Sequence, residues 1–247
     1  MKAFTKIPPY YDTLMTEINY KRWVAYILDI FDRFNISPKK ILDLACGTGT
    51  CCLLFAKSGF DVMGVDSSKG MLDVAKSKTK RFNIKFSCQD MANFSLSQKV
   101  DVVTCLFDSL NYLLEEEELS NVYKCAYDVL NDGGFFIFDM NTEYGLSTCW
   151  GNKVYVKENK NVLSIWRNSF DTKSHIARLD LSLFIKKNGY YERLDETHFE
   201  KAYQNSKIED LLYSTHFKEI HVYRHLSFEK PSYYTPRIMA AAKKQEA

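Results

Sequence analysis

The sequence predicts an α/β fold in which a doubly wound, mostly parallel sheet carries helices on both faces, with a small antiparallel sheet inserted late in the chain. Two patterns lead to this prediction. Between residues 39 and 140, short apolar runs alternate with longer mixed segments, as strands alternate with helices in such folds. Between residues 153 and 199, apolar and polar residues alternate, as in strands with one solvent-facing side.

The first region contains five predicted strands with helices between them. The apolar run of residues 40–45 and the β-branched residues of 100–107 are typical of buried strands. In the helix predicted over 115–130, apolar side chains recur at steps of three and four residues. The remaining predictions are strands at 61–65, 83–87 and 135–140, helices at 50–58 and 68–78, and a turn at 131–134.

The rest of the chain is divided by two changes of pattern. The inserted sheet is predicted from strands at 153–158, 162–170, 176–186 and 190–199, with Asn188-Gly189 as a hairpin turn. A helix at 207–213 and strands at 219–224 and 237–242 then follow, and the N-terminal residues are predicted to be helical up to Pro38. We therefore expect an N-terminal helical lid (1–38), an α/β domain (39–145 and 201–247) and an inserted sheet (146–200).

The composition excludes several classes of protein. The 33 basic and 31 acidic residues leave a net charge of +2, which predicts no electrostatic surface for nucleic acid or an anionic membrane. No run reaches the roughly 18 to 20 apolar residues of a membrane helix, and no signal peptide is visible, so we expect a cytoplasmic protein. The seven cysteines include no Cys-x-x-Cys pair and the five histidines no metal-binding motif, so no metal site is predicted.

The segment from Leu42 to Gly49 covers the end of the first predicted strand and the Gly-x-Gly loop that follows it. Gly47 and Gly49 let the backbone pass close to a ligand because they have no Cβ. A dinucleotide-binding loop would have a third glycine where this chain has Cys52, and no Gly-Lys-Ser/Thr phosphate loop is present. Asp43, inside the strand, is poorly placed for a pyrophosphate and well placed for a cationic ligand.

Carboxylates also follow the next strands. Asp66 ends the second predicted strand, where it can accept hydrogen bonds from both hydroxyls of a ribose. Asp90 follows the third strand, where it can accept a bond from an adenine amino group, and Phe107-Asp108 follows the fourth. Because the carboxyl ends of parallel strands meet at one edge of a sheet, we expect these residues to share one crevice.

Together these motifs resemble those of the class I S-adenosylmethionine-dependent methyltransferases. Residues 42–49 are similar to the family's glycine-rich first motif, Asp66 to its ribose-binding acid, and Gln89-Asp90-Met91 to its adenine contact. Residues 130–134 resemble the Leu-x-x-Gly-Gly turn before its fifth strand. The resemblance, over 40–140 and 207–243, implies a seven-stranded Rossmann-like sheet whose last strand is antiparallel. It also implies S-adenosyl-L-methionine as methyl donor and S-adenosyl-L-homocysteine as product.

The resemblance implies a set of donor-binding residues as well. Gly47 and Gly49 would lie against the amino-acid part of the donor, and Met71 beside its adenine ring. The full expected set is Tyr11, Tyr20, Arg22, Asp43, Ala45, Cys46, Gly47, Thr48, Gly49, Asp66, Ser67, Met71, Gln89, Asp90, Met91 and Phe107.

A finer resemblance concerns the acceptor. Tyr10-Tyr11-Asp12, residues 107–113 and the inserted sheet are similar to a subgroup that methylates small molecules and includes sugar N-methyltransferases and glycine N-methyltransferases. The sugar enzymes carry a histidine where this chain has Tyr112. A small-molecule acceptor is therefore the expected partner. If that acceptor arrives protonated, Tyr11, Asp108 and Tyr112 are the candidate general bases.

Three other functions fit parts of the pattern. An NAD-dependent oxidoreductase would use a similar sheet, but Asp43 and the missing third glycine argue against it. A non-catalytic protein could bind the donor with the same motifs. An RNA or protein methyltransferase is the third. The small net charge argues against RNA as the acceptor. Enzymes that methylate exocyclic nitrogens carry Asn-Pro-Pro-Tyr after the fourth strand, and this chain has Phe107-Asp108-Ser109-Leu110 there, which argues against that activity.

Overall fold

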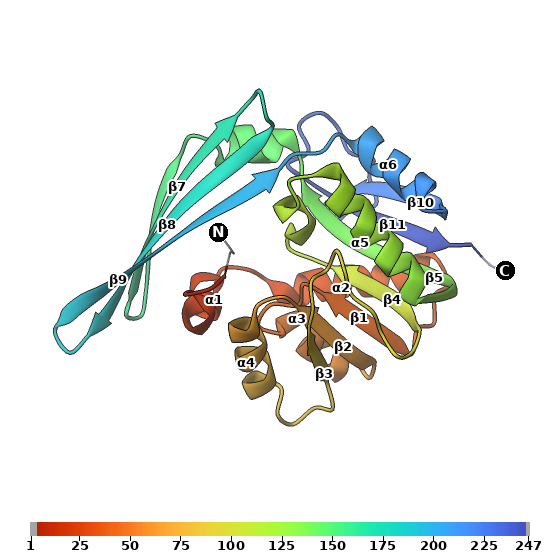
Figure 1. Ribbon diagram of the computed structural model, residues 1–247, viewed down its shortest axis with the longest axis horizontal. Helices are drawn as coiled ribbons and strands as arrows, with labels where there is room; N and C mark the ends of the chain where they lie inside the picture. The colour runs from red at the N-terminus through yellow and green to blue at the C-terminus, as the bar shows by residue number, and fades with distance from the viewer. Residues whose placement is uncertain (1–3, 246–247) are drawn as a thin grey trace.

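The computed structural model describes residues 4–245, which form two sheets and the helices around them (Figure 1). The larger sheet has seven strands in the order β10-β11-β5-β4-β1-β2-β3. All neighbours pair in parallel except β11, which is antiparallel to both β5 and β10. The seven-stranded, mostly parallel sheet is therefore confirmed. Its strands are β1 (Lys40–Leu44), β2 (Asp61–Asp66), β3 (Lys85–Cys88), β4 (Val100–Cys105), β5 (Leu130–Asn141), β10 (Phe217–Arg224) and β11 (Arg237–Lys244).

Helices cover both faces of this sheet (Figure 1). One core lies under α5 and α6 and contains Leu42 and Val103, and the other lies under α2 and α3 and contains Ile41 and Phe55. Ile41 and Leu42 are neighbours on β1 and enter opposite cores, which explains the uninterrupted apolar run of this strand. The helices are α2 (Tyr20–Arg33), α3 (Thr50–Lys57), α4 (Lys69–Lys78), α5 (Glu116–Val129) and α6 (Asn205–Ser214).

The strand order reverses between β1 and β4. The chain runs outward from β1 through β2 to β3, and then returns to β4 on the other side of β1. The connections that leave the carboxyl ends of β1 and β4 therefore diverge, and a crevice opens between them. The glycine loop after β1 and the Phe107-Asp108 turn after β4 border this crevice.

The second sheet is formed by residues between β5 and α6. It is an antiparallel meander of β6 (Val154–Asn159), β7 (Val162–Asp171), β8 (Ile176–Lys187) and β9 (Tyr190–Lys201). Asn188 and Gly189 have φ values of +47° and +87°, as the predicted hairpin turn requires. The sheet stands beside the larger one (Figure 1), and its inner face packs against α1 (Pro8–Leu14).

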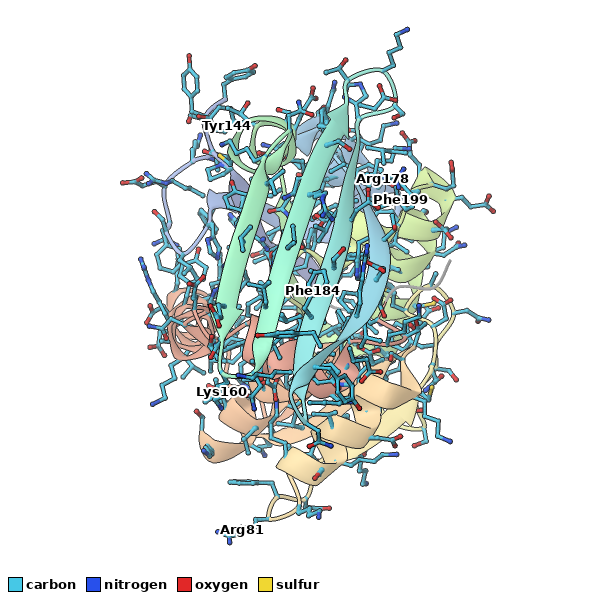
Figure 2. The ribbon with its side chains drawn as sticks, turned by 90° about the vertical axis from the view of Figure 1, so that its left-hand side faces the viewer. Arg81, Tyr144, Lys160, Arg178, Phe184 and Phe199 are labelled. Carbon is cyan, nitrogen blue, oxygen red and sulfur yellow. The ribbon has the colours of Figure 1, made fainter. Side chains whose placement is uncertain are left out.

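Figure 2 shows the outer face of this second sheet. Arg178 and Phe199 lie beside each other on β8 and β9, with the guanidinium carbon 6.0 Å from the ring centroid. Side chains alternate between the two faces of a strand. His198 and Glu200, the neighbours of Phe199, therefore point to the inner face.

Two predicted segments differ in detail. The turn expected at 131–134 lies within β5 as a bulge, because Leu130 pairs with Val100 and the next pair is Phe135 with Val102. The N-terminal helical region consists of two helices, and α2 ends at Arg33, since Asn35 adopts a left-handed conformation with φ +50°. Among the helices of residues 4–245, none is long and apolar enough to cross a membrane. Two short segments were not predicted, the 3-10 helix η1 (Ser109–Tyr112) and the π-helix η2 (Gly145–Trp150).

Candidate active site

A cavity of about 750 Å³ lies between the carboxyl ends of β1 to β4 and the inner face of the second sheet. The strand-end half of its lining is formed by loops of the larger sheet and includes Asp43, Gly47, Asp66, Asp90 and Phe107. The sheet half is formed by α1, η1 and strands β7 to β9 and includes Tyr11, Tyr112, Trp166, His198 and Glu200. The cavity thus joins the two parts of the fold.

The two glycines of the loop have different surroundings. Gly47 has φ +54°, and a Cβ built on it would meet no atom within 4 Å, so its open side faces the cavity. Gly49 has φ +71°, but a Cβ there would lie 2.9 Å from the Cβ of Ala75 and 3.3 Å from the ring of Phe86. Gly47 therefore leaves room for a ligand, whereas Gly49 leaves room for α4.

Asp66 fixes the loops around it. One carboxylate oxygen accepts a hydrogen bond from the N–H of Gly47 at 2.8 Å, and the other accepts one from the N–H of Ser68 at 2.7 Å. Burial raises the pKa of Asp66, and these two N–H groups oppose the shift. Each carboxylate oxygen has a further lone pair, so Asp66 can also accept bonds from ligand hydroxyls.

Asp43 lies buried beneath the glycine loop, at 2% exposure. Its carboxylate accepts hydrogen bonds from the Thr104 hydroxyl at 2.8 Å and the Cys52 thiol at 3.3 Å. Burial raises the pKa of Asp43 to about 6 in spite of these bonds. A cation on the cavity side would favour its charged form.

The turn after β4 is held in an unusual conformation by Asp139 of β5. Phe107 and Asp108 both have left-handed φ values, +61° and +53°. Their N–H groups donate to the two carboxylate oxygens of Asp139, at 2.6 and 3.0 Å. The guanidinium of Arg237 on β11 donates to the carboxylates of Asp139 and Asp108, the latter at 2.7 Å. Asp108 is therefore part of a partly buried ion pair with Arg237, which opposes its predicted role as a free general base.

The sheet half of the cavity is rich in aromatic rings. The ring of Phe4 lies 5.9 Å from that of Tyr11, 5.3 Å from that of Tyr112 and 4.9 Å from that of His198. Burial raises the pKa of Tyr11 and of Tyr112 above the ordinary phenol value. Both tyrosines are thus neutral near pH 7. In that form a phenol can donate a hydrogen bond or present a ring face to a ligand more readily than it can accept a proton.

Glu200 is the acidic group of the sheet half. One oxygen, Oε2, accepts a hydrogen bond from the side-chain amide of Asn141 at 2.9 Å. Burial and the nearby charge of Asp108 raise the pKa of Glu200 to about 8. Glu200 therefore changes charge close to neutral pH, as groups that exchange protons with a ligand do.

The N-terminal segment crosses the sheet half as a strap, defined here as residues 4–7. The carboxylate of Glu196 on β9 accepts hydrogen bonds from the N–H groups of all four strap residues. The Ser68 hydroxyl at the start of α4 donates to the carbonyl of Phe4 at 2.9 Å. The strap is thus tied to both walls of the cavity.

Most of the predicted site residues meet in this cavity. Arg22 and Gly49 do not line it: Arg22 is exposed on the first turn of α2, and Gly49 packs against α4. Asp139, Arg237, Glu196, His198 and Glu200 were not predicted. For Asp139 the available signal was a carboxylate inside an apolar strand. The predicted residues that do line the cavity are Tyr11, Tyr20, Asp43, Ala45, Cys46, Gly47, Thr48, Asp66, Ser67, Met71, Gln89, Asp90, Met91, Phe107, Asp108 and Tyr112.

Proteins similar to this chain in sequence and structure include methyltransferases. The family described as Methyltransferase domain matches residues 41–134. The curated protein GWCH70_2453 of Geobacillus sp. (strain WCH70), whose name places it among the methyltransferases, is 30% identical over 95% of this chain and 97% of its own. The crystal structure of an S-adenosylmethionine-dependent methyltransferase from Clostridium acetobutylicum ATCC 824 is 30% identical over 96% of both chains, with a TM-score of 0.87. The sugar N-methyltransferase KedS8 from Streptoalloteichus sp ATCC 53650 has the same fold, with a TM-score of 0.84 and 16% identity over 100% of this chain and 96% of its own.

The fold and the cavity define a protein that binds a small ligand at the point where strand order reverses. The chain belongs to the S-adenosylmethionine-dependent methyltransferases. The residues of the strand-end half fit this donor, because Gly47 leaves open space and Asp66, which lines the cavity, can accept further hydrogen bonds. When bound, the donor supplies an electrophilic methyl group on a positively charged sulfur.

Proposed function

We propose that this methyltransferase acts on a small molecule held in the sheet half of the cavity. The observation that carries the proposal is the strap, which Glu196 and Ser68 tie across the cavity and which places the ring of Phe4 against Tyr11, Tyr112 and His198. A cavity covered in this way has room for a small ligand beside the donor, whereas a polynucleotide or a folded protein would need an open approach.

Different parts of the chain would bind the donor and the acceptor. The α/β domain (39–145 and 201–247) binds the donor, and the lid (1–38) and the inserted sheet (146–200) form the acceptor wall. Residues 1–3 and 246–247 of these ranges lie outside the described residues. Within the donor site, Asp66 would receive the ribose hydroxyls, Asp90 and Met71 the adenine, and Gly47 the amino-acid part.

The main catalytic task is positioning. The sulfur leaves as a neutral thioether and needs no acid. The protein therefore has to hold the acceptor atom, the methyl carbon and the sulfur in line, which can lower a barrier by roughly 7 to 11 kcal/mol. The rigid turn at Phe107 and Asp108, fixed by Asp139, borders both halves of the cavity and is well placed for this task.

The size class of the acceptor can be tested directly. The protein is incubated with donor carrying an isotopically labelled methyl group and with a cell extract, which is then separated into low-molecular-weight and macromolecular fractions. We expect the label in the low-molecular-weight fraction. Label confined to RNA or protein would contradict the proposal. A Gly47→Val variant, which we expect not to bind the donor, is the control. It measures the label that other enzymes of the extract transfer.

A further inference from the structure

Glu200 faces the part of the cavity where the acceptor would lie. We propose that Glu200 binds the nucleophilic nitrogen of the acceptor and removes its proton, and hence that the acceptor is an amine that arrives protonated. This inference rests on the proposed transfer of a methyl group to a small molecule.

The Glu200 side chain is held in place and keeps one oxygen for a ligand. Oε2 accepts the bond from Asn141, whose backbone N–H donates to the Asn111 side chain at 2.9 Å. The Asn111 amide in turn donates to the carbonyls of Asn141 and of Lys201, the residue after Glu200. Within residues 4–245, no protein group donates a hydrogen bond to the other oxygen, Oε1. A ligand with N–H groups can fill that position.

The charges around Glu200 favour a cation. Asp108, on the turn after β4, and Asp139, on β5, both contribute negative charge, and Arg237, on β11, is the cation that faces them. Arg237 is already bound to the two aspartates, so three carboxyl groups share one guanidinium. Tyr112, on η1, is neutral because burial raises its pKa. A protonated amine at Oε1 would offset the surplus negative charge.

The remaining walls suit an amine with an apolar body. The rings of Phe4, Tyr11, Tyr112 and Trp166 line the same half of the cavity, and aromatic faces attract ammonium groups. Leu179 and Leu181 of β8 add an aliphatic surface. An alcohol acceptor would gain nothing from the charge, and it would leave the carboxylate facing a neutral group.

The proton balance of the step is complete without any further reactant. The ammonium group of the acceptor, R–NH3⁺, gives one proton to the Glu200 carboxylate and becomes R–NH2. Its lone pair forms the new bond to the methyl carbon, while the electron pair of the breaking carbon–sulfur bond stays on sulfur. The product R–NH2⁺–CH3 leaves as a cation, and Glu200 returns its proton to water.

The test uses n-butylamine and n-butanol as probes, because they share a body and differ in the group that would meet Glu200. Binding of each to the protein loaded with S-adenosylhomocysteine is measured by NMR titration at about pH 9, where Glu200 is ionised and the amine is still protonated. We expect butylamine to bind at least about tenfold more tightly than butanol, and Glu200→Gln to remove this preference. Glu192→Gln, which neutralises an exposed carboxylate on the same strand, should preserve it.

A second measurement needs no variant. Lowering the pH from about 9 to about 7 crosses the pKa of Glu200 and should weaken butylamine binding about tenfold while leaving butanol unaffected. Equal affinity for the two probes, or an amine preference that survives in Glu200→Gln, would overturn the assignment. Loading with S-adenosylhomocysteine is checked first by calorimetry. If S-adenosylhomocysteine does not bind, the proposed function is contradicted and not the role of Glu200. Butylamine binding to the unloaded protein then still tests Glu200.

Discussion

The carboxylate of Asp139 accepts a hydrogen bond from the backbone N–H of Asp108 at 3.0 Å, and so holds a left-handed turn at the carboxyl end of the neighbouring strand. Asp139 is fully buried, and its other partners are the N–H of Phe107 and the guanidinium of Arg237. One buried carboxylate thus joins β4, β5 and β11 beneath the cavity.

Asp139→Asn is expected to destabilise the protein by about 3 kcal/mol, because it puts an amide NH2 group, which cannot accept a hydrogen bond, opposite the buried N–H of either Phe107 or Asp108 and also weakens the pairing with Arg237. Urea unfolding followed by circular dichroism measures the loss. Asp210→Asn, at an exposed carboxylate of α6, should change the free energy of unfolding by less than about 0.5 kcal/mol. Equal stability of the two variants would mean that Asp139 does not support the turn.

Glu196→Gln is expected to loosen the strap. The carboxylate accepts four backbone N–H bonds, and bonds to a charged acceptor contribute about 1.5 to 3 kcal/mol each, so amide exchange at residues 5–7 should accelerate at least about tenfold. Hydrogen exchange monitored by NMR checks this rate. Exchange unchanged from wild type would show that other contacts hold the strap.

The strap should also respond to acid. Burial acts to raise the pKa of Glu196, but His198, whose Nε2 lies 3.3 Å away, and the strap N–H groups outweigh it and lower the pKa to about 2. A depressed carboxyl pKa stabilises the folded form above the ordinary value of about 4.3, and this stabilisation is lost as the pH falls toward 2. The ring resonances of Phe4 should therefore keep their folded shifts at pH 5 and lose them only in stronger acid. Loss already between pH 6 and 5 would contradict this assignment.

Asp12 links α1 to the glycine loop. Its carboxylate accepts a bond from the Thr48 hydroxyl at 2.6 Å and pairs with Lys78 of α4, also at 2.6 Å. The groups are partly exposed, so the contribution is about 1 kcal/mol or less, and Asp12→Asn should weaken donor binding up to about fivefold. Calorimetry measures the change, with Asp73→Asn on the exposed side of α4 as the control. A similar loss of donor affinity in both variants would mean that Asp12 has no specific part in donor binding.

The sequence predicted the α/β domain well because its signals are local. The apolar runs of β1 and β4 and the glycine loop depend on residues close together in the chain. The acceptor wall could not be predicted in the same way. The strand predicted over 190–199 ended before Glu200, and alternation alone gave no reason to single out Glu196 or His198. Only the docking of the second sheet decides that their face of β9 meets η1 and the strap. Asp139 was missed because its partners come from β4 and from β11, far away in sequence.

In the proposed donor site, the strand-end half of the cavity holds the methyl donor against the open side of Gly47. Calorimetric titration with S-adenosylmethionine of Gly47→Val and Gly59→Val tests it most directly. Both glycines have positive φ and no atom within 4 Å of a built Cβ, so both variants carry the same kind of backbone strain, but only Gly47 lines the cavity. We predict that Gly47→Val abolishes donor binding and that Gly59→Val keeps the wild-type affinity. Equal affinity in the two variants would mean that the donor does not lie against Gly47.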